Sequence, residues 1–336
     1  IPLVEESQGG ELLERIPKLR SRLVNDLGFQ IPLVRVRDDL SLSSNQYVIE
    51  IWGAKVAESE LMPDHLMAFN PSGEEMGQVE GIPTTEPTFG LPALWIREEN
   101  QQQAKDAGYT TIVTPEDVLI THLEEVIKNH AYEVLSLQCV QDMLDRQREI
   151  NPALVDAVIS DDALSLVDVH KVLKNLLSER ISIRNLPLIL ESLADHGRET
   201  KDATILTEYV RQAIKREIVQ NTLTNDGKLA AIMLSPNLQQ TISSFVQENE
   251  PLDPGVIRQM LSNISQQVQT ATERGKHPVV LLCPSQIRKQ VQSWTAGPMP
   301  SLSVLSYEEM PPSIDLETVG VVDVRPNATQ ANMSDE

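Results

Sequence analysis

Six histidines and two cysteines are the side chains of this 336-residue chain best suited to metal binding or nucleophilic chemistry. His122 and His130 lie eight positions apart on one predicted helix, so their rings can share a helix face. Metal sites usually combine a closer pair with further ligands, and the adjacent Glu124 and Glu125 are more simply the solvated face of the same helix. We therefore expect no metal site.

Other catalytic signatures are weak throughout the sequence. No glycine pair has the spacing before Lys and Ser or Thr that a phosphate-binding loop requires, and no nucleophile-elbow motif marks a serine. Cys139 and Cys283 lie far apart in apolar surroundings, which argues against a disulfide framework or a cysteine-rich zinc site and fits a reducing compartment. We expect no catalytic residue and no cofactor, and an unrecognised soluble hydrolase stays open as an alternative.

Phe89 is one of only four phenylalanines and stands between Pro87 and Gly90, in a loop that enters a predicted strand. Proline fixes the backbone of such a loop and glycine permits its tight turn, so the ring is held in one place. It either plugs a local core or offers an apolar contact to a partner. The residues alone favour the plug and leave the contact open.

The charge of the chain excludes several classes of partner. Its 49 acidic and 28 basic residues give a net charge of -21, which repels phosphate backbones and anionic lipids. We expect no nucleic-acid or peripheral-membrane contact, whereas basic or amphipathic protein partners would be attracted, although solubility alone also accounts for such a charge. The sequence has no apolar run long enough to span a bilayer and no secretion signal, and it starts without Met on 1–10, which is typical of a linker. We expect a further segment upstream.

Apolar spacing predicts the elements of the first part of the chain. A helix is expected at 12–27 with Gly28 as its stop, followed by extended segments at 33–36 and 46–56 that form a small sheet under this helix. Residues 61–90 are rich in proline and glycine, which predicts turns and irregular backbone in an inserted piece. A strand at 93–96, a polar helix at 98–107 and a strand at 109–113 then complete a small mixed sheet.

The remaining sequence predicts a helical region and then an α/β region. Thr114 and Pro115 mark the start of a long helix. Further helices are predicted at 154–159, 164–177, 187–196, 204–219, 254–274 and 284–294. Strands are predicted at 229–234, 279–282, 302–305 and 318–324.

Together these elements predict an α+β chain of several subdomains: two small mixed α/β units, the second inserted in the first, a central all-helical unit and a C-terminal α/β unit. The expected boundaries are a linker at 1–20, a first unit at 21–60 and 97–130, an inserted unit at 61–96, a helical unit at 131–220, a C-terminal unit at 221–325 and a disordered tail at 326–336.

Several sequence runs resemble the FlhA family, the flagellar type III export gate proteins. These runs are 86–96, 108–110, 118–123, 171–177, 183–186, 206–211, 304–309 and 319–323. The resemblance extends over about 10–324, and the joint order of the runs is far more specific than any one of them.

The resemblance implies a function in docking. It implies an eight-span membrane half upstream, a linker, and a cytosolic part of four subdomains that forms a nonameric ring at the cytoplasmic face of the bacterial inner membrane. Substrate-loaded export chaperones and other export-apparatus components would bind, chaperones in a cleft between the first two subdomains, and substrates would pass to the channel. A cleft of this kind implies a hinge, which we expect near the chain crossings at Leu61 and Ile96.

The resemblance also implies which residues contact the partner. Glu86, Phe89 and Thr121 fall where the family carries chaperone-contacting residues, although the family more often has Asp at the position of Glu86. Phe89 is thereby reinterpreted from plug to anchor for an amphipathic helix. The homologous gate of a virulence injectisome remains an alternative, while 88–96 and 319–323 look more flagellar.

Overall fold

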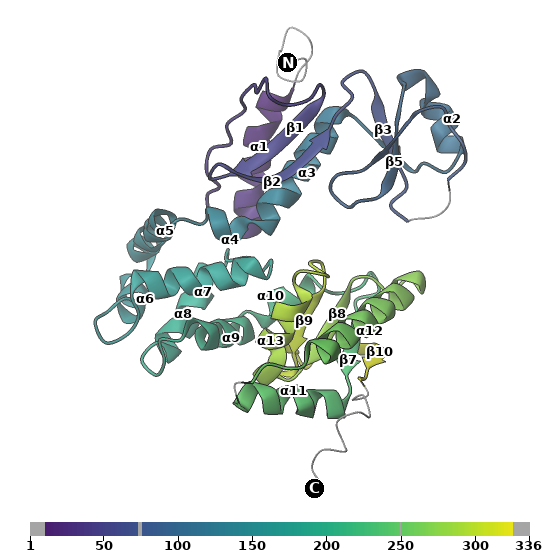
Figure 1. Ribbon diagram of the computed structural model, residues 1–336. Coiled ribbons are helices and arrows are strands. Elements are labelled where there is room, and N and C mark those ends of the chain that lie inside the picture. Colours follow the sequence, from purple (N-terminus) through teal and green to yellow (C-terminus); the bar gives the residue numbers. More distant parts are fainter. Residues whose placement is uncertain (1–10, 73–75, 249, 325–336) are drawn as a thin grey trace. The chain divides into compact units, whose positions relative to one another are not determined.

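The computed structural model describes residues 11–72, 76–248 and 250–324 (Figure 1). Its internal contacts divide the chain into two compact units, Ile1–Ala203 and Thr204–Glu336. Helices and strands both contribute substantially, so the expected mixed α and β class is confirmed. Within the described residues, no helix is both long enough and apolar enough to cross a bilayer. The N-terminal segment 1–10 and the tail 326–336 lie outside the described residues.

The chain begins with helix α1 (Leu12–Leu27) and the hairpin of β1 (Gln46–Ile51) and β2 (Ala54–Glu60). The predicted helix is confirmed, because its apolar residues recur every three or four positions and are buried. The predicted linker at 1–20 is wrong where it overlaps this helix.

Two strand predictions in the same part need correction. Residues 33–36 form no strand, because they pair with no other strand and Leu33 is exposed to solvent. The predicted segment 46–56 is divided by a turn, since Trp52 and Gly53 both have positive φ, as a tight two-residue hairpin turn requires.

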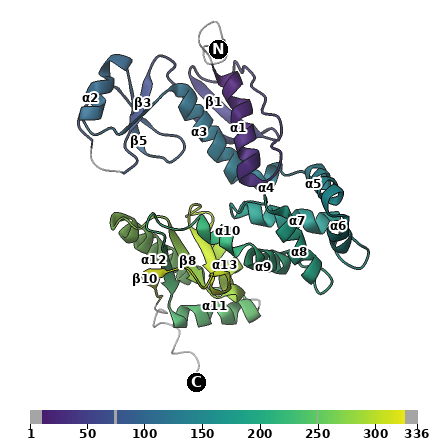
Figure 2. The ribbon, with the colours of Figure 1, turned by 180° about the vertical axis from the view of Figure 1, so that it is seen from behind.

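Helix α3 (Pro115–Asn129) lies beside α1 in both views (Figures 1 and 2). Arg15 of α1 pairs with Asp117 of α3, and Arg22 pairs with Glu124, each 102 positions further along the chain. A constant separation means that the two helices run parallel. The first turn of α3 is closed by a reciprocal capping box in which the Thr114 side chain accepts from the Asp117 backbone N–H, so the predicted start is confirmed.

A sheet of four strands follows the hairpin in the order β4-β5-β3-β6. Its strands are β3 (Leu66–Phe69), β4 (Ile82–Thr85), β5 (Pro92–Ile96) and β6 (Thr111–Val113), with η2 (Glu98–Asn100) and α2 (Gln101–Asp106) between the last two. All pairings are antiparallel, so the predicted mixed sheet is wrong. Met67 and Trp95 face a core shared with Val118 of α3, whereas Ala68 and Ile96 face Ala104 of α2.

Two further expectations fail in this sheet. The segment 61–90 was expected to be irregular, yet it contains β3 and β4; Pro83 fits in β4 because an edge strand tolerates a missing N–H. The expected end of the inserted unit at 96 divides the sheet, because β6 lies beyond it.

The middle of the chain is helical, as predicted. It contains α4 (Ala131–Val134), α5 (Leu137–Ile150), α6 (Pro152–Val158), α7 (Leu166–Ser178), α8 (Leu186–His196), α9 (Ala203–Ala213) and α10 (Lys215–Gln220). The helix predicted at 204–219 is divided at Ile214 into α9 and α10. The expected boundary at 220 also differs from the division at Ala203, since α9 belongs to the second compact unit.

The second unit contains a parallel sheet in the order β10-β7-β8-β9. Its elements are β7 (Leu229–Leu234), α11 (Pro236–Glu248), α12 (Pro254–Glu273), β8 (Val279–Cys283), α13 (Ser285–Thr295), β9 (Ser303–Ser306), η3 (Tyr307–Glu309) and β10 (Leu316–Val322). The four predicted strands and the two predicted helices are confirmed. Helix α11 was not predicted, although Leu238 and Ile242 form a short buried stripe on it.

Candidate functional site

The loop between β4 and β5 is organised by one buried carboxylate. Glu86 is only 3% exposed, and its Oε1 and Oε2 accept hydrogen bonds from the backbone N–H groups of Thr88 (2.9 Å) and Phe89 (2.7 Å). Its own backbone N–H donates to the Leu91 carbonyl (2.8 Å), and its carbonyl accepts from Gly90 (3.0 Å). Gly90 has φ of 69°, which a residue with a side chain adopts only with strain. The loop is thus closed by four hydrogen bonds centred on a single residue.

This loop presents Phe89 to solvent. The side chain is 64% exposed, so its interpretation as a plug in a local core is wrong. The adjacent backbone is held by the Glu86 carboxylate, whose charge strengthens hydrogen bonds from N–H donors. An exposed aromatic ring on a fixed backbone loses little conformational freedom when a partner covers it.

In this loop conformation, one buried polar atom has no hydrogen-bond partner among the described residues. The Thr88 hydroxyl oxygen is buried and has no hydrogen-bond partner within the part of the chain that the structure describes. A buried hydroxyl without a partner costs about 1 to 3 kcal/mol.

A tyrosine that packs against the same apolar cluster as Leu91 of this loop meets a histidine. Tyr47 of β1 and His122 of α3 approach to 2.6 Å between Oη and Nδ1, with ring centroids 5.7 Å apart and planes at 74°. Burial raises the pKa of Tyr47, reinforced by the charge of Glu86, while a hydrogen bond with Ser59 opposes the rise. Burial lowers the pKa of His122, and the Glu86 charge opposes that change. The phenol thus stays protonated and the imidazole neutral at pH 7, and the two rings share one hydrogen bond between Oη and Nδ1.

The structure brings some of the predicted partner-binding residues together. Glu86 and the backbone of Phe89 are directly bonded, and the carboxylate of Glu86 is close enough to act electrostatically on His122. Thr121 precedes His122 on α3 and is exposed. The roles of Tyr47 and His122 were not predicted, since the two residues are 75 positions apart in sequence.

The two histidines considered as metal ligands have different partners. His122 is bonded to Tyr47, whereas His130 Nδ1 lies 2.8 Å from Glu133 Oε1. Across residues 11–72, 76–248 and 250–324, no group of three or more His, Cys, Asp or Glu side chains is arranged to hold a metal ion.

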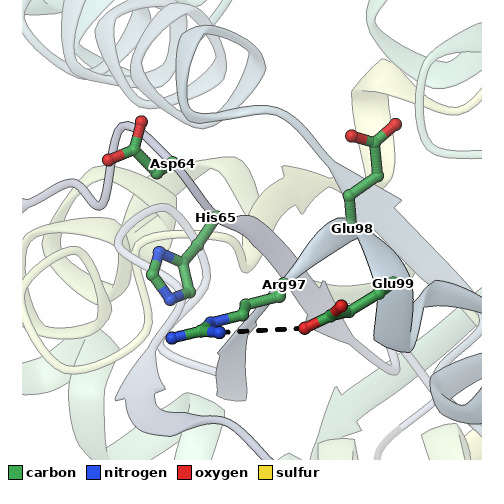
Figure 3. A pocket seen from close by; sticks show the side chains of 5 residues that line it. All are labelled: Asp64, His65, Arg97, Glu98 and Glu99. Atoms are coloured by element: carbon green, nitrogen blue, oxygen red, sulfur yellow. Dashed lines mark ion pairs between the residues drawn. The ribbon is translucent and has the colours of Figure 1, made fainter.

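A charged hollow of about 690 Å³ lies between the segment that precedes β3 and the segment that follows β5 (Figure 3). Asp64 and His65 line it just before β3, and Arg97, Glu98 and Glu99 line it just after β5. Its one ion pair, Arg97 with Glu99 at 3.8 Å, is exposed, and such a pair contributes little to stability. The predicted hinge near Leu61 and Ile96 falls beside this hollow and stays a prediction.

A family model described as the FHIPEP family matches residues 1–315. The chain belongs to the FHIPEP family. Curated relatives include the flagellar biosynthesis protein FlhA of Bacillus subtilis, 38% identical over 329 residues, and that of Proteus mirabilis, 36% identical over 314 residues. These alignments cover 96% and 92% of the chain but only 48% and 44% of the relatives, so the chain spans about half their length. The resemblance to FlhA is confirmed.

Solved structures with the same fold include a cytosolic domain from a type III secretion system. The Chlamydia pneumoniae CdsV protein is 26% identical with a TM-score of 0.76, covering 92% of this chain and 90% of that one. CdsV has also been solved in complex with CdsO, with a TM-score of 0.78 and 27% identity over 91% and 88% of the two chains. The nonameric EscV cytosolic domain shares the fold at 21% identity, with a TM-score of 0.73 and coverage of 94% and 93%.

Proposed function

We propose that this FHIPEP chain is the cytosolic docking platform of a flagellar type III protein export gate and not an enzyme. It binds substrate-loaded export chaperones through a surface that contains Phe89, Glu86 and Thr121, and it passes their substrates to the channel. The observation that carries the proposal is the exposed Phe89 ring on a loop fixed by the buried Glu86 carboxylate.

This loop has the physical properties of an anchor for an amphipathic helix. Binding energy at protein interfaces concentrates in a few aromatic side chains that are held in place before binding. The sequence around this loop is negatively charged, because residues 61–113 contain eight acidic and two basic side chains. A helix with one apolar face and basic flanks is therefore the partner that this surface favours.

The relatives support the wider setting of this proposal. CdsV has been solved with CdsO, and EscV forms a nonamer, which supports binding of other export-apparatus components and assembly of a nine-membered ring by this chain. The platform would lie at the cytoplasmic face of the bacterial inner membrane. A segment that corresponds to the part of the relatives not spanned by this chain would attach it to that membrane. The flagellar system is favoured over an injectisome because curated FlhA relatives reach 38% identity, against 21% for the EscV cytosolic domain from a type III secretion system.

Replacing Phe89 with alanine should weaken docking without unfolding the chain. We expect Phe89→Ala to lower the affinity for a substrate-loaded flagellar export chaperone of the same organism by about 1 to 4 kcal/mol, because the anchor is lost while the loop keeps its Glu86 hydrogen bonds. Isothermal titration calorimetry measures the change, and circular dichroism checks the fold.

Leu40→Ala is the control, since Leu40 is a fully exposed apolar residue of the same compact unit. It should leave the affinity unchanged. Equal affinities of wild type and a folded Phe89→Ala variant would remove Phe89 from the docking surface.

A further inference from the structure

Residues 31–37 pass from α1 to β1 without forming a helix, a turn or a strand. The Ile31 carbonyl accepts hydrogen bonds from Arg20 Nε (3.3 Å) and Nη2 (2.7 Å) of α1, and Arg37 Nη2 lies 3.9 Å from Glu50 Oε2 of β1. Between these contacts, the backbone N–H groups of 33–37 donate to no other described residue. A row of unpaired N–H and C=O groups is a template on which another strand can add.

The exposed side chains of this segment are apolar and basic. Leu33 is 74% exposed and Val36 is 44% exposed, and both arginines of the segment are exposed as well. Arg35 forms no ion pair with another described residue, and the contact of Arg37 with Glu50 is long and open to solvent. Because the chain has a net charge of -21, two arginines without close acidic partners are unusual here. They favour an apolar partner segment that carries carboxylates.

We propose that residues 1–6 of the same chain add to 33–37 as a parallel strand, which makes α1 the crossover helix of a βαβ unit. The added strand fixes the point at which the chain enters the first compact unit. The inference does not depend on the docking function, because none of these residues belongs to the Phe89 loop.

The sequence of the N-terminal segment matches the chemistry of this surface. Residues 1–4 and 31–34 both read Ile-Pro-Leu-Val, and two glutamates follow the first run. When the two runs are aligned in register, their apolar residues lie side by side and Glu5 is placed opposite Arg35. Opposite charges on neighbouring strands stabilise the pairing. Pro2 is compatible with this arrangement, because the start of an edge strand tolerates a missing N–H.

The chain between the two segments has the length that a parallel pairing needs. Parallel strands require a crossover of a dozen or more residues, usually a helix. Residues 7–30 supply it, since they contain α1, whose 16 residues are about 24 Å long. Gly9 and Gly10 precede this helix and Gly28 ends it, so the chain can turn at both ends. Residues 1–10 extend over at most about 36 Å, which is enough to return along the whole helix.

Hydrogen exchange of the 33–37 amides in the whole 336-residue chain tests the pairing, with Leu3→Pro/Val4→Pro as the variant. Successive N–H groups of a strand point to opposite sides, so replacing both residues removes whichever N–H faces 33–37. We expect the amides that are protected in the wild type to exchange at least about tenfold faster in this variant. Ser7→Pro/Gln8→Pro is the matched control, since both prolines then lie outside the proposed strand, and it should leave the exchange unchanged.

A charge reversal tests the register without proline. Arg35→Glu should lose protection of 33–37, because Glu5 then faces a like charge, and Glu5→Arg in the same chain should restore it. Glu6→Arg in place of Glu5→Arg gives the same net charge, but its side chain points to the opposite face of the strand. It should therefore restore less protection.

The outcomes decide each part of the inference. Equal exchange of the 33–37 amides in wild type and folded Leu3→Pro/Val4→Pro would overturn the pairing. The α3 amides report the fold of the same unit, and if the proline variant changes them, the charge variants decide alone. Failure of Glu5→Arg to restore protection, or an equal rescue by Glu6→Arg, would overturn the in-register alignment. Protection that rises with protein concentration would assign the surface to a second copy and overturn pairing within one chain.

Discussion

A methyl group at Gly28 is expected to cost about 2 to 6 kcal/mol of the free energy of unfolding. Gly28 ends α1 with φ of 90°, and an ideal Cβ there would lie 2.2 Å from the Arg184 backbone nitrogen and 2.6 Å from the Ile183 carbonyl carbon. Backbone atoms cannot turn aside as a flexible side chain can, so the two segments must separate. Overpacking and a strained φ each cost about 1 to 3 kcal/mol, and Gly28→Ala suffers both.

The separation would break a specific contact. The Ile183 backbone N–H donates to the Leu27 carbonyl at 2.9 Å, which attaches the end of α1 to the segment between α7 and α8. Loss of this hydrogen bond would uncouple the first helix of the chain from its helical region.

Gly108→Ala is the matched control for Gly28→Ala. Gly108 has nearly the same φ, 95°, but its added Cβ would meet nothing within 4 Å. We expect Gly108→Ala to lose only about 1 to 2 kcal/mol, the cost of the conformation alone. Urea denaturation followed by circular dichroism measures both variants. If Gly28→Ala proves no less stable than Gly108→Ala, the close approach to Arg184 is not a constraint on folding.

The sequence predicted best where local patterns decide the structure. The stripe of apolar residues on α1, the Thr114 cap and the continuous apolar runs of β7 and β8 each carry their own signal. Prediction failed where the structure of a segment depends on the strand with which it pairs. The prolines of 61–90 argued against strands, yet Pro83 fits in β4 because β4 is an edge strand. Residues 33–36 have the composition of a strand, but no neighbouring strand pairs with them.

The same distinction between local patterns and distant partners applies to the candidate site. The Glu86 loop is local, and its proline and glycine correctly indicated a stiff turn. Whether Phe89 points inward or outward depends on the sheet beneath it, and the residues alone favoured the wrong direction. Tyr47 and His122 meet only because α3 returns to the hairpin 75 positions later, a pairing that no local pattern contains.

The second large effect is expected at a buried ion pair in the C-terminal unit. Arg211 of α9 and Glu309 of η3 are 2% and 1% exposed, and their Nε and Oε1 atoms lie 2.7 Å apart. Arg211 also donates to the Val304 carbonyl of β9 at 3.2 Å, and Glu309 accepts the Ser306 backbone N–H at 2.6 Å. Nearby, Arg288 of α13 donates to Glu208 of α9 at 2.7 Å. These contacts explain why α9 belongs with the parallel sheet.

Removing one member of this pair should be strongly destabilising. We expect Arg211→Met to cost about 3 to 5 kcal/mol, because the Glu309 carboxylate is left buried without its cation. Hydrogen exchange of the β8 amides, which lie in the core of this unit, measures the change. Lys228→Met is the control, since Lys228 and Asp315 form a pair that is 43% and 71% exposed, and it should cost less than about 1 kcal/mol.

The double variant decides whether the charge or the shape of the pair matters. Glu309→Gln keeps an oxygen for the Ser306 N–H but removes the charge, so adding it to Arg211→Met leaves neither ion unpaired. We expect the double variant to be more stable than either single variant, because burying two charges is itself expensive and their loss together removes that penalty. Additive losses would mean instead that the two side chains stabilise the unit separately, through Val304 and Ser306, and that α9 is held to the sheet by those backbone hydrogen bonds without help from the ion pair.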